Sequence, residues 1–362
     1  LIYFNRDSYD ESLSWYQKVV QYYPSTPASN EAMLAIKEIY IAKGDPAGYI
    51  TYANKYPGSK VTVSEQDSLV YLSAEKQFFN GDMDKALQGF TNYLTQFPKG
   101  YFALQANFYR AECLFTKQDF PNALKGYEYV ISQSQNRFTE RSTARAANIN
   151  YYDLKNYVRS YELYTKLQTV ATLDENKREC LIGLMRTSFY LKKYQECLDN
   201  TTKVAALPSL PEFYKAEMAY YKGMCYYNLK DYDKSVKELE FVVKNANNEQ
   251  AAESKYTVAK IYYLKGNKKQ AEKDCNEYLD KFPSYEYYLG KTFILLSDIY
   301  KDDKKLLQAK ATLQSLLDNY SQDDDVKAEA QQKLDAILSS EMDNSRLKQQ
   351  DNGLQMQFDN DK

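Results

Sequence analysis

Polar turns followed by apolar helical patterns recur along the chain at a nearly constant spacing. One such turn, Lys230-Asp231, precedes Tyr232 and, three residues later, the small residue Ser235. That small residue recurs at steps of 36 to 38 residues with one double step of 74, at Ser12, Ala86, Ala123, Ser160, Cys197, Ser235, Ala271 and Ala309. We call these eight residues the anchors. Their spacing predicts tandem repeats of about 37 residues.

Each repeat is predicted to contain two amphipathic helices of about 13–15 residues. Ahead of anchor Ser235, apolar side chains at Ala219, Gly223 and Tyr227 have the i, i+4, i+8 spacing of one helix face. The same spacing follows the anchor, and a second small residue stands twelve positions before most anchors. Several repeats end in an aromatic residue and a proline, which stops a helix: Tyr23-Pro24, Tyr56-Pro57, Phe97-Pro98 and Phe282-Pro283.

Nine such repeats fit residues 1–338, the first without its leading helix and the second irregular around Gly44-Asp45. The predicted fold class is all-α, a right-handed α-solenoid of tandem helix–turn–helix repeats. Residues 339–362 break the pattern, because half of the chain from Glu341 onward is Asn, Asp or Gln. We expect them to form a polar, disordered C-terminal tail.

Composition narrows the function. Lys and Arg number 47 against 49 Asp and Glu, for a net charge of −2, which argues against nucleic-acid binding. The chain has no histidine, which removes the common nucleophile–histidine pairs and histidine metal sites. It has no glycine-rich phosphate loop and no catalytic serine motif. We therefore expect no enzyme activity, no cofactor and no metal.

The five cysteines are widely spaced, and no two form a C-x-x-C pair. We expect each to be a free thiol buried between helices, as a small apolar side chain. The internal apolar stretches are far shorter than the ~20 residues that a membrane span needs. The chain begins at Leu1 without an initiator Met or a signal sequence, so we interpret it as a mature or excised fragment.

The repeat resembles the tetratricopeptide repeat. The resemblance rests on small Gly223, aromatic Tyr226, aromatic Tyr232 and small Ser235 at relative positions 0, 3, 9 and 12, with a proline near the end of several repeats. The run from Phe97-Pro98-Lys99-Gly100 to Cys113 is similar to bacterial cell-envelope members, of the Tol–Pal-associated and outer-membrane assembly lipoprotein types. The abundance of Tyr, Asn, Lys and Asp resembles a Bacteroidetes version.

In that family the first helix of each repeat lines a concave groove. The resemblance places the groove at positions −15, −11 and −8, counted back along the chain from each anchor. The partner-binding candidates at these positions are Tyr71, Glu75, Phe78, Phe108, Glu112, Phe115, Arg145, Tyr152, Arg186, Phe189, Tyr220, Tyr227, Tyr256, Lys260 and Tyr263. Along the chain, the acidic candidates Glu75 and Glu112 precede the basic candidates Arg145, Arg186 and Lys260, and aromatic candidates lie between them. The Lys/Asn/Arg clamp of chaperone-docking members is missing.

The function predicted from these features is a non-catalytic scaffold that binds a peptide segment or protein partner in the groove. The resemblance implies a periplasmic or outer-membrane location in envelope assembly or maintenance. It leaves membrane anchoring through a region before Leu1 open. Two alternatives stand beside this function: a glycan-binding envelope protein, because aromatic platforms also stack on sugars, and a purely structural array in which the aromatic rings are core.

Overall fold

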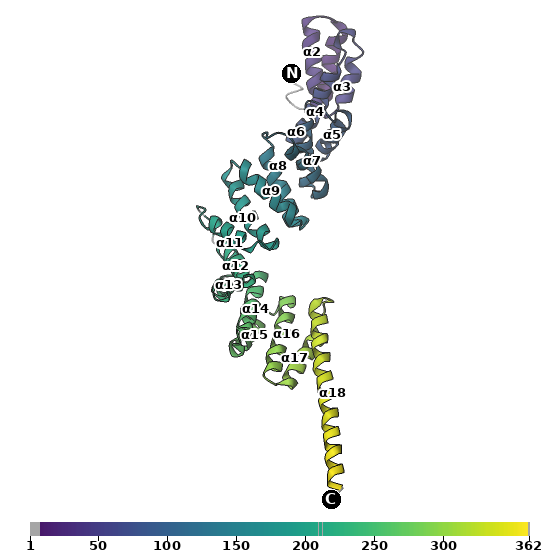
Figure 1. The fold of residues 1–362 in the computed structure, drawn as a ribbon. Helices are drawn as coiled ribbons and strands as arrows, with labels where there is room; N and C mark the ends of the chain where they lie inside the picture. The colour runs from purple at the N-terminus through teal and green to yellow at the C-terminus, as the bar shows by residue number, and fades with distance from the viewer. Residues whose placement is uncertain (1–7, 209, 212, 361–362) are drawn as a thin grey trace. The chain divides into compact units, whose positions relative to one another are not determined.

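The computed structural model describes residues 8–208, 210–211 and 213–360, with side chains for all of these except residues 57 and 343–360. Throughout this part of the chain the regular structure is helical. The chain divides into two compact units (Figure 1), unit 1 over Leu1–Gly183 and unit 2 over Leu184–Lys362. The all-α solenoid of helical repeats predicted from the sequence is confirmed.

Unit 1 consists of helix pairs joined by short turns. Its helices are α1 (Tyr9–Tyr22), α2 (Pro27–Lys43), α3 (Pro46–Ala53), α4 (Val63–Phe79), α5 (Met83–Gln96), α6 (Ala103–Thr116), α7 (Phe120–Ser132), α8 (Thr139–Asn148) and α9 (Tyr157–Val170). A 3-10 turn at Pro57–Ser59 follows the short helix α3. Helix α10 (Asp174–Tyr190) contains the boundary between the units.

Unit 2 repeats the same pairing. Its helices after α10 are α11 (Tyr194–Ala205), α12 (Phe213–Asn228), α13 (Tyr232–Asn245), α14 (Glu249–Leu264), α15 (Lys268–Lys281), α16 (Glu286–Asp302), α17 (Leu306–Asn319) and α18 (Asp325–Asn360). The first helix of each repeat packs on its own second helix and on the first helix of the next repeat, as α12 does on α13 and α14.

The polar turn inside each repeat has one backbone design. One residue adopts a left-handed conformation with φ between 52° and 82°, at Gly44, Gly81, Gln118, Lys155, Lys192, Lys230, Gly266 and Lys304. The next residue is the N-cap of the second helix, and where it is Asp or Asn its side chain accepts a backbone N–H three residues later, as Asp82 does from Lys85 at 3.1 Å. Second helices therefore start three residues before the anchors.

The anchors are the points where paired helices touch. All eight are buried, with at most 2% of their surface exposed. Ser235 Oγ donates to the carbonyl of Gly223 at 2.8 Å. A Cβ on Gly223 would lie 2.5 Å from Leu239 Cδ2, so glycine is needed for this close approach. The helix pairing depends on small residues facing one another.

Helix α8, the first helix of the repeat with anchor Ser160, departs from the small-residue pattern. Asn148 stands twelve positions before that anchor, where most repeats have a small residue. Helix α8 ends there and continues as a π-helical turn over Ile149–Asp153. The Asn148 side chain accepts the Tyr164 hydroxyl at 2.5 Å. Local geometry thus changes where a polar side chain enters the interface. Met185, the other large substitute, is fully buried.

Helix α18 does not end with the predicted repeats. Residues 339–360 continue it as a helix to Asn360. The disordered tail expected over residues 339–362 stays a prediction, and residues 361 and 362 lie outside the described residues. Between residues 325 and 360 the sequence has no proline and only Gly353 as a helix-breaking residue, so the backbone has little to stop it. None of the helices over the described residues is both long and apolar enough to cross a membrane.

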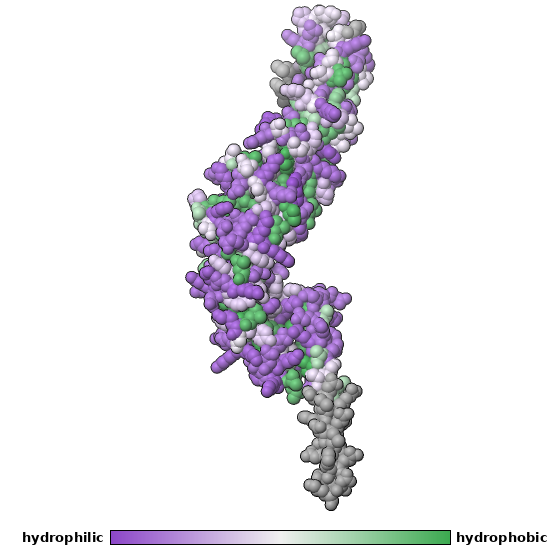
Figure 2. Space-filling view, in the orientation of Figure 1, coloured by the Kyte–Doolittle hydropathy of each residue, from purple (hydrophilic) through white to green (hydrophobic). Residues whose placement is uncertain are grey.

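The visible face is mainly hydrophilic, with apolar side chains in small separate patches (Figure 2). The five cysteines are free and buried, as predicted. Burial raises the pKa of the Cys113 thiol to about 12, because the thiolate would lose its hydration. The cysteines therefore act as packing residues.

A carboxylate joins two repeats of unit 1 at the start of α10. Glu140 of α8 accepts hydrogen bonds from Thr172 Oγ1 at 2.7 Å, the Leu173 amide at 3.1 Å and Asn176 Nδ2 at 2.8 Å. Burial favours the protonated acid, but these hydrogen bonds outweigh it and lower the pKa of Glu140 to about 2. The charged form therefore stabilises this joint.

We predict that overpacking an anchor destabilises the array. Replacing Ala123 by Leu inserts a large side chain at a fully buried position and is expected to lower the free energy of unfolding by ~1–3 kcal/mol. Urea unfolding followed by circular dichroism measures this. Lys125→Leu, at an exposed position of the same helix, is the matched control and is expected to change stability by less than about 0.5 kcal/mol. Equal effects would contradict the assigned register.

We also predict a pH-dependent contribution from Glu140. Its folded pKa of about 2 lies below its ordinary value of 4.5, so its contribution is present above pH 4.5 and is lost as pH falls from there toward 2. Glu140→Gln is expected to lower the free energy of unfolding by about 1 kcal/mol at pH 7 and by less than that at pH 3. Urea unfolding at both pH values measures it. A difference that does not shrink at low pH would refute the charged role.

Candidate functional site

The structure separates the fifteen partner-binding candidates by burial. Tyr71, Phe108, Glu112 and Tyr220 are buried, with at most 7% of their surface exposed. Tyr152 is 46% exposed. The others are half-buried: Glu75, Phe78, Phe115, Arg145, Arg186, Phe189, Tyr227, Tyr256, Lys260 and Tyr263. The set is therefore partly core and partly surface.

Rings at position −15 from the anchor pack between successive first helices. Tyr71 stacks on Phe102, just before α6, with ring centroids 4.3 Å apart. Phe108 stacks on Phe138, just before α8, at 4.4 Å. These two rings and Tyr220 fill the joint between repeats, which agrees with the alternative that aromatic rings of this kind are core. They offer no surface to a partner.

Rings at position −8 from the anchor pack on the turn of their own repeat. Phe115 lies 5.6 Å from Phe120, Phe189 lies 6.1 Å from Tyr194, and Tyr227 lies 6.2 Å from Tyr232, measured between ring centroids. In each pair the second ring is the first residue of the second helix. These half-buried rings cover the turn with one face and leave part of their surface exposed.

Two of the predicted groove charges are neutralised within their own unit. Glu112 forms an ion pair with Arg141 and accepts the Tyr127 hydroxyl at 2.7 Å. Arg186 binds Glu217 through two bonds, Nε to Oε1 at 2.6 Å and Nη2 to Oε2 at 2.9 Å. Two of the five charges in the gradient expected from the sequence are therefore compensated within the chain. Its error was to consider only first-helix positions −15, −11 and −8.

Three candidates have a charge with no ion pair among the described residues. Glu75 accepts the Tyr71 hydroxyl at 2.6 Å. The Arg145 guanidinium lies over the Phe115 ring, 4.1 Å from its centroid. Lys260 Nζ lies 5.7 Å from the centroid of the Tyr256 ring. These groups keep a charge available for a partner.

Lys260 lies in a cavity of about 360 Å³ on the first-helix face of unit 2. Helices α12, α14, α16 and α18 supply the lining, which consists of Met224, Tyr227, Glu253, Tyr256, Thr257, Lys260, Tyr287, Tyr288, Lys291 and Glu329. Three of the sequence candidates, Tyr227, Tyr256 and Lys260, are brought together here. We call this the α14 cavity.

The acid at one wall of the α14 cavity is held by tyrosine hydroxyls. Tyr220 donates to Glu253 Oε2 at 2.5 Å, and Tyr288 donates a second hydrogen bond. Burial raises the pKa of Glu253, and the two hydroxyl hydrogen bonds offset part of the rise. The same burial, together with the Glu253 charge, raises the pKa of Tyr220. Glu253 is thus occupied by groups of its own unit.

The lysines of the α14 cavity differ in their partners. Lys291 Nζ binds Asp325 at 2.6 Å and Glu329 at 3.0 Å. Lys260 has no such acid among the described residues. Lys260 stands at position −11 from one anchor and Lys291 at position −18 from the next, which are the positions of Arg186 and Glu217 at an earlier joint of unit 2. Two cations therefore occupy positions that elsewhere hold an ion pair.

Sequence reasoning missed Glu253, Tyr287, Tyr288, Lys291 and Glu329. Positions −18 and −22 from the anchor lie on the same helix face as positions −15, −11 and −8, so extending the pattern by two turns would have found Glu253, Tyr287 and Lys291. Glu329 belongs to α18, outside the regular pattern. The described residues contain no cluster of His, Cys, Asp or Glu able to hold a metal ion.

The fold defines an α-solenoid of helical repeats. Residues 220–286, from within α12 to the start of α16, match the family model of the tetratricopeptide repeat. This segment is therefore similar to the tetratricopeptide repeat, and it supplies six of the ten residues that line the α14 cavity. A comparison with curated protein sequences found no match.

Several solved structures are similar to the chain. A signal transduction ATPase with a tetratricopeptide repeat sensor from Pyrococcus horikoshii has 16% identity over 86% of this chain and 50% of that chain, with a TM-score of 0.50. A tetratricopeptide repeat protein from Parabacteroides merdae has 12% identity, coverage of 75% and 98%, and a TM-score of 0.44. A thermophilic repeat protein of Thermus thermophilus has 20% identity, coverage of 54% and 98%, and a TM-score of 0.37.

We predict that the Arg186–Glu217 pair couples α10 and α12. Both side chains are only 13–14% exposed, so removing one leaves the other charge poorly solvated. Arg186→Met or Glu217→Met is expected to lower the free energy of unfolding by about 2–3 kcal/mol. The double variant is expected to lower it by less than the sum of the two single changes. Urea unfolding of the four proteins measures the coupling. Lys177→Met, which breaks an exposed pair with Asp174, is the control; additive effects at 186 and 217 would contradict the coupling.

Proposed function

We propose that this chain is a non-catalytic protein–protein interaction scaffold whose α14 cavity binds an acidic side chain of a partner segment. The observation that carries the proposal is Lys260, a half-buried cation in a 360 Å³ cavity with no acid to pair with among the described residues. A carboxylate entering the cavity would take the place that Glu217 takes opposite Arg186. The partner would thus complete a pairing that the joint between α10 and α12 makes internally.

The walls of the α14 cavity suit a peptide segment. Tyr227, Tyr256 and Tyr287 line the cavity, and tyrosine is enriched among the residues that dominate binding energy at interfaces. A hydrogen bond from a lysine to a carboxylate is stronger than one between neutral groups. In this proposal the rings supply contact area, and Lys260 selects for acid and fixes its position.

The finer parts of the function rest on the sequence. A chain without histidine, phosphate loop or catalytic serine motif supports a non-catalytic role. The resemblance of the run from Phe97 to Cys113 to envelope members supports a place in envelope assembly or maintenance, with a periplasmic or outer-membrane location and anchoring through a region before Leu1. Fractionation of the native organism, probed with an antibody to this chain, tests that location. Recovery in the cytoplasmic fraction would refute it.

The binding proposal predicts charge selectivity that depends on Lys260. The probes are two fluorescein-labelled, amidated octapeptides, Gly-Ser-Glu-Phe-Glu-Phe-Ser-Gly and its counterpart with Gln at both Glu positions, measured by anisotropy. Wild type is expected to bind the Glu peptide 5–10-fold more tightly, which corresponds to about 1–1.4 kcal/mol. Lys260→Gln is expected to abolish the difference, and added salt to reduce it.

The control is Lys237→Gln, an exposed lysine on second helix α13 outside the cavity, which should preserve the selectivity. Equal binding of the two peptides by wild type would refute the acidic-side-chain site. Binding of neither peptide, with loss of stability in Tyr227→Ala and Tyr256→Ala, would favour the structural array instead.

A further inference from the structure

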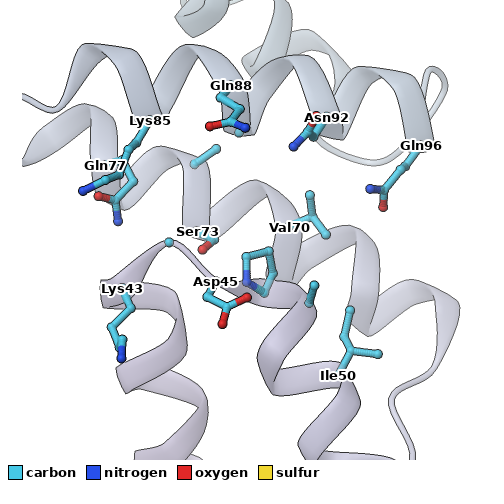
Figure 3. Close-up of a pocket in the computed structure, with 15 residues that line it drawn as sticks. Lys43, Asp45, Ile50, Val70, Ser73, Gln77, Lys85, Gln88, Asn92 and Gln96 are labelled. Carbon is cyan, nitrogen blue, oxygen red and sulfur yellow. The ribbon is translucent and has the colours of Figure 1, made fainter. Parts of the chain in front are cut away.

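Unit 1 has a second cavity, of about 460 Å³, on the side of the second helices. It lies between the junction of α2 and α3 and the facing side of α4 and α5 (Figure 3). Helix α3 has 8 residues, whereas the other second helices have 12–14. Helix α3 is thus shorter than these by 4–6 residues, and its first half lines the cavity opposite α5.

At two other joints a hydrogen bond links successive second helices. Lys166 of α9 donates to the carbonyl of Ile131 in α7 at 2.8 Å. Lys281 of α15 donates to the carbonyl of Val243 in α13 at 2.5 Å. In both, a side chain at position +6 or +10 from the anchor binds a carbonyl near the end of the preceding second helix. That contact satisfies a helix-end carbonyl that would otherwise have no partner.

In α5 the same two positions are Asn92 and Gln96, and the preceding helix α3 ends at Ala53, too early to supply the carbonyl. Gln88, Asn92 and Gln96 stand at i, i+4 and i+8 and point from α5 across the cavity toward α2 and α3 (Figure 3). All three are exposed, and none has a hydrogen bond to another described residue. We call these three residues the amide row.

The remaining lining is apolar or already paired. Ile50 and Val70 lie opposite the amide row (Figure 3). Lys43 binds Asp10 at 2.5 Å, and Lys85 binds Asp82 at 2.9 Å. Asp45 accepts the Gly48 amide at 2.9 Å as the cap of α3. The cavity thus presents uncompensated donors and acceptors without an uncompensated charge, which favours an uncharged, hydrogen-bonding ligand.

The spacing of the amide row matches an extended peptide. Residues four apart on a helix are separated by ~6 Å along its axis. Backbone groups that face the same side of an extended chain recur every two residues, or ~6.6–6.8 Å. Each carboxamide has both donors and an acceptor, so it can bind one backbone N–H and one C=O. Three amides can therefore follow about five residues of extended backbone.

We propose that this cavity binds an extended, uncharged segment of a partner protein, whose backbone groups pair with Gln88, Asn92 and Gln96. The segment supplies carbonyls to Asn92 and Gln96, as the preceding second helices supply carbonyls to Lys166 and Lys281. This site is separate from the α14 cavity, and it recognises the backbone groups of a peptide rather than a charged side chain. Its failure would leave the proposed function of unit 2 untouched.

The test is a titration of the full chain, labelled with ¹⁵N, followed through the side-chain amide signals. The probe is the acetylated and amidated peptide Ser-Val-Thr-Ser-Val-Thr-Ser. It is expected to shift the signals of Gln88, Asn92 and Gln96. A peptide of the same sequence with N-methylated valines, which cannot donate from those positions, is expected to bind at least tenfold more weakly. Asn92→Ala should have a similar effect on the unmodified peptide.

Two further variants distinguish peptide binding in the cavity from binding elsewhere on the chain. Ala47→Trp fills the cavity from an exposed lining position without removing an amide, and it is expected to abolish the shifts. Asn245→Ala, at the register position of Gln96 in α13, where the side chain bonds only its own helix, should leave binding unchanged. Equal binding of the methylated peptide, unaltered binding by Ala47→Trp, or shifts with maltoheptaose but not with the peptide would overturn the proposal.

Discussion

Contact between a small anchor at the start of each second helix and the first helix of the same repeat is the constraint on which the structure depends. At Ser235 the side chain is close enough to donate to the Gly223 carbonyl at 2.8 Å, and there is no room for a Cβ on Gly223. Each contact fixes the relative position of two helices. Because repeats bury their apolar faces only against neighbours, the contacts recur along the array and distribute its stability.

Once the helix pairs are fixed, the side chains between repeats pack together, form ion pairs or bind backbone carbonyls. Rings at position −15 from the anchor fill the joint, as Tyr71 does against Phe102. At the joint between α10 and α12, the side chains at position −11 from one anchor and −18 from the next, Arg186 and Glu217, form an ion pair. Lysines on second helices bind the carbonyls of the preceding second helix, as Lys166 does. Several polar groups at the joints are therefore paired within the chain, whereas Glu75, Arg145 and Lys260 have no ion pair among the described residues.

The sequence was sufficient to predict the helix pairs, because one buried small residue per repeat leaves a signal that recurs. It predicted the anchors and the start of each second helix. It did not predict the π-helical turn after Asn148, which depends on how a single polar side chain meets Tyr164. Nor did it predict the neutralisation of Glu112 and Arg186. Their partners, Arg141 and Glu217, lie in neighbouring repeats, which a pattern counted within one repeat does not show.

Both cavities lie where a joint departs from the regular arrangement. In unit 2, Lys260 and Lys291 occupy positions that hold an ion pair elsewhere, and of the two only Lys291 finds acids among the described residues, in α18. In unit 1, α3 ends too early to meet the amides of α5. Each departure exposes the polar group that a regular joint would satisfy, and so it defines the chemistry of what can bind: a carboxylate in one case and a peptide backbone in the other. In a solenoid whose regular joints satisfy their own groups, binding sites are expected where the repeat is irregular.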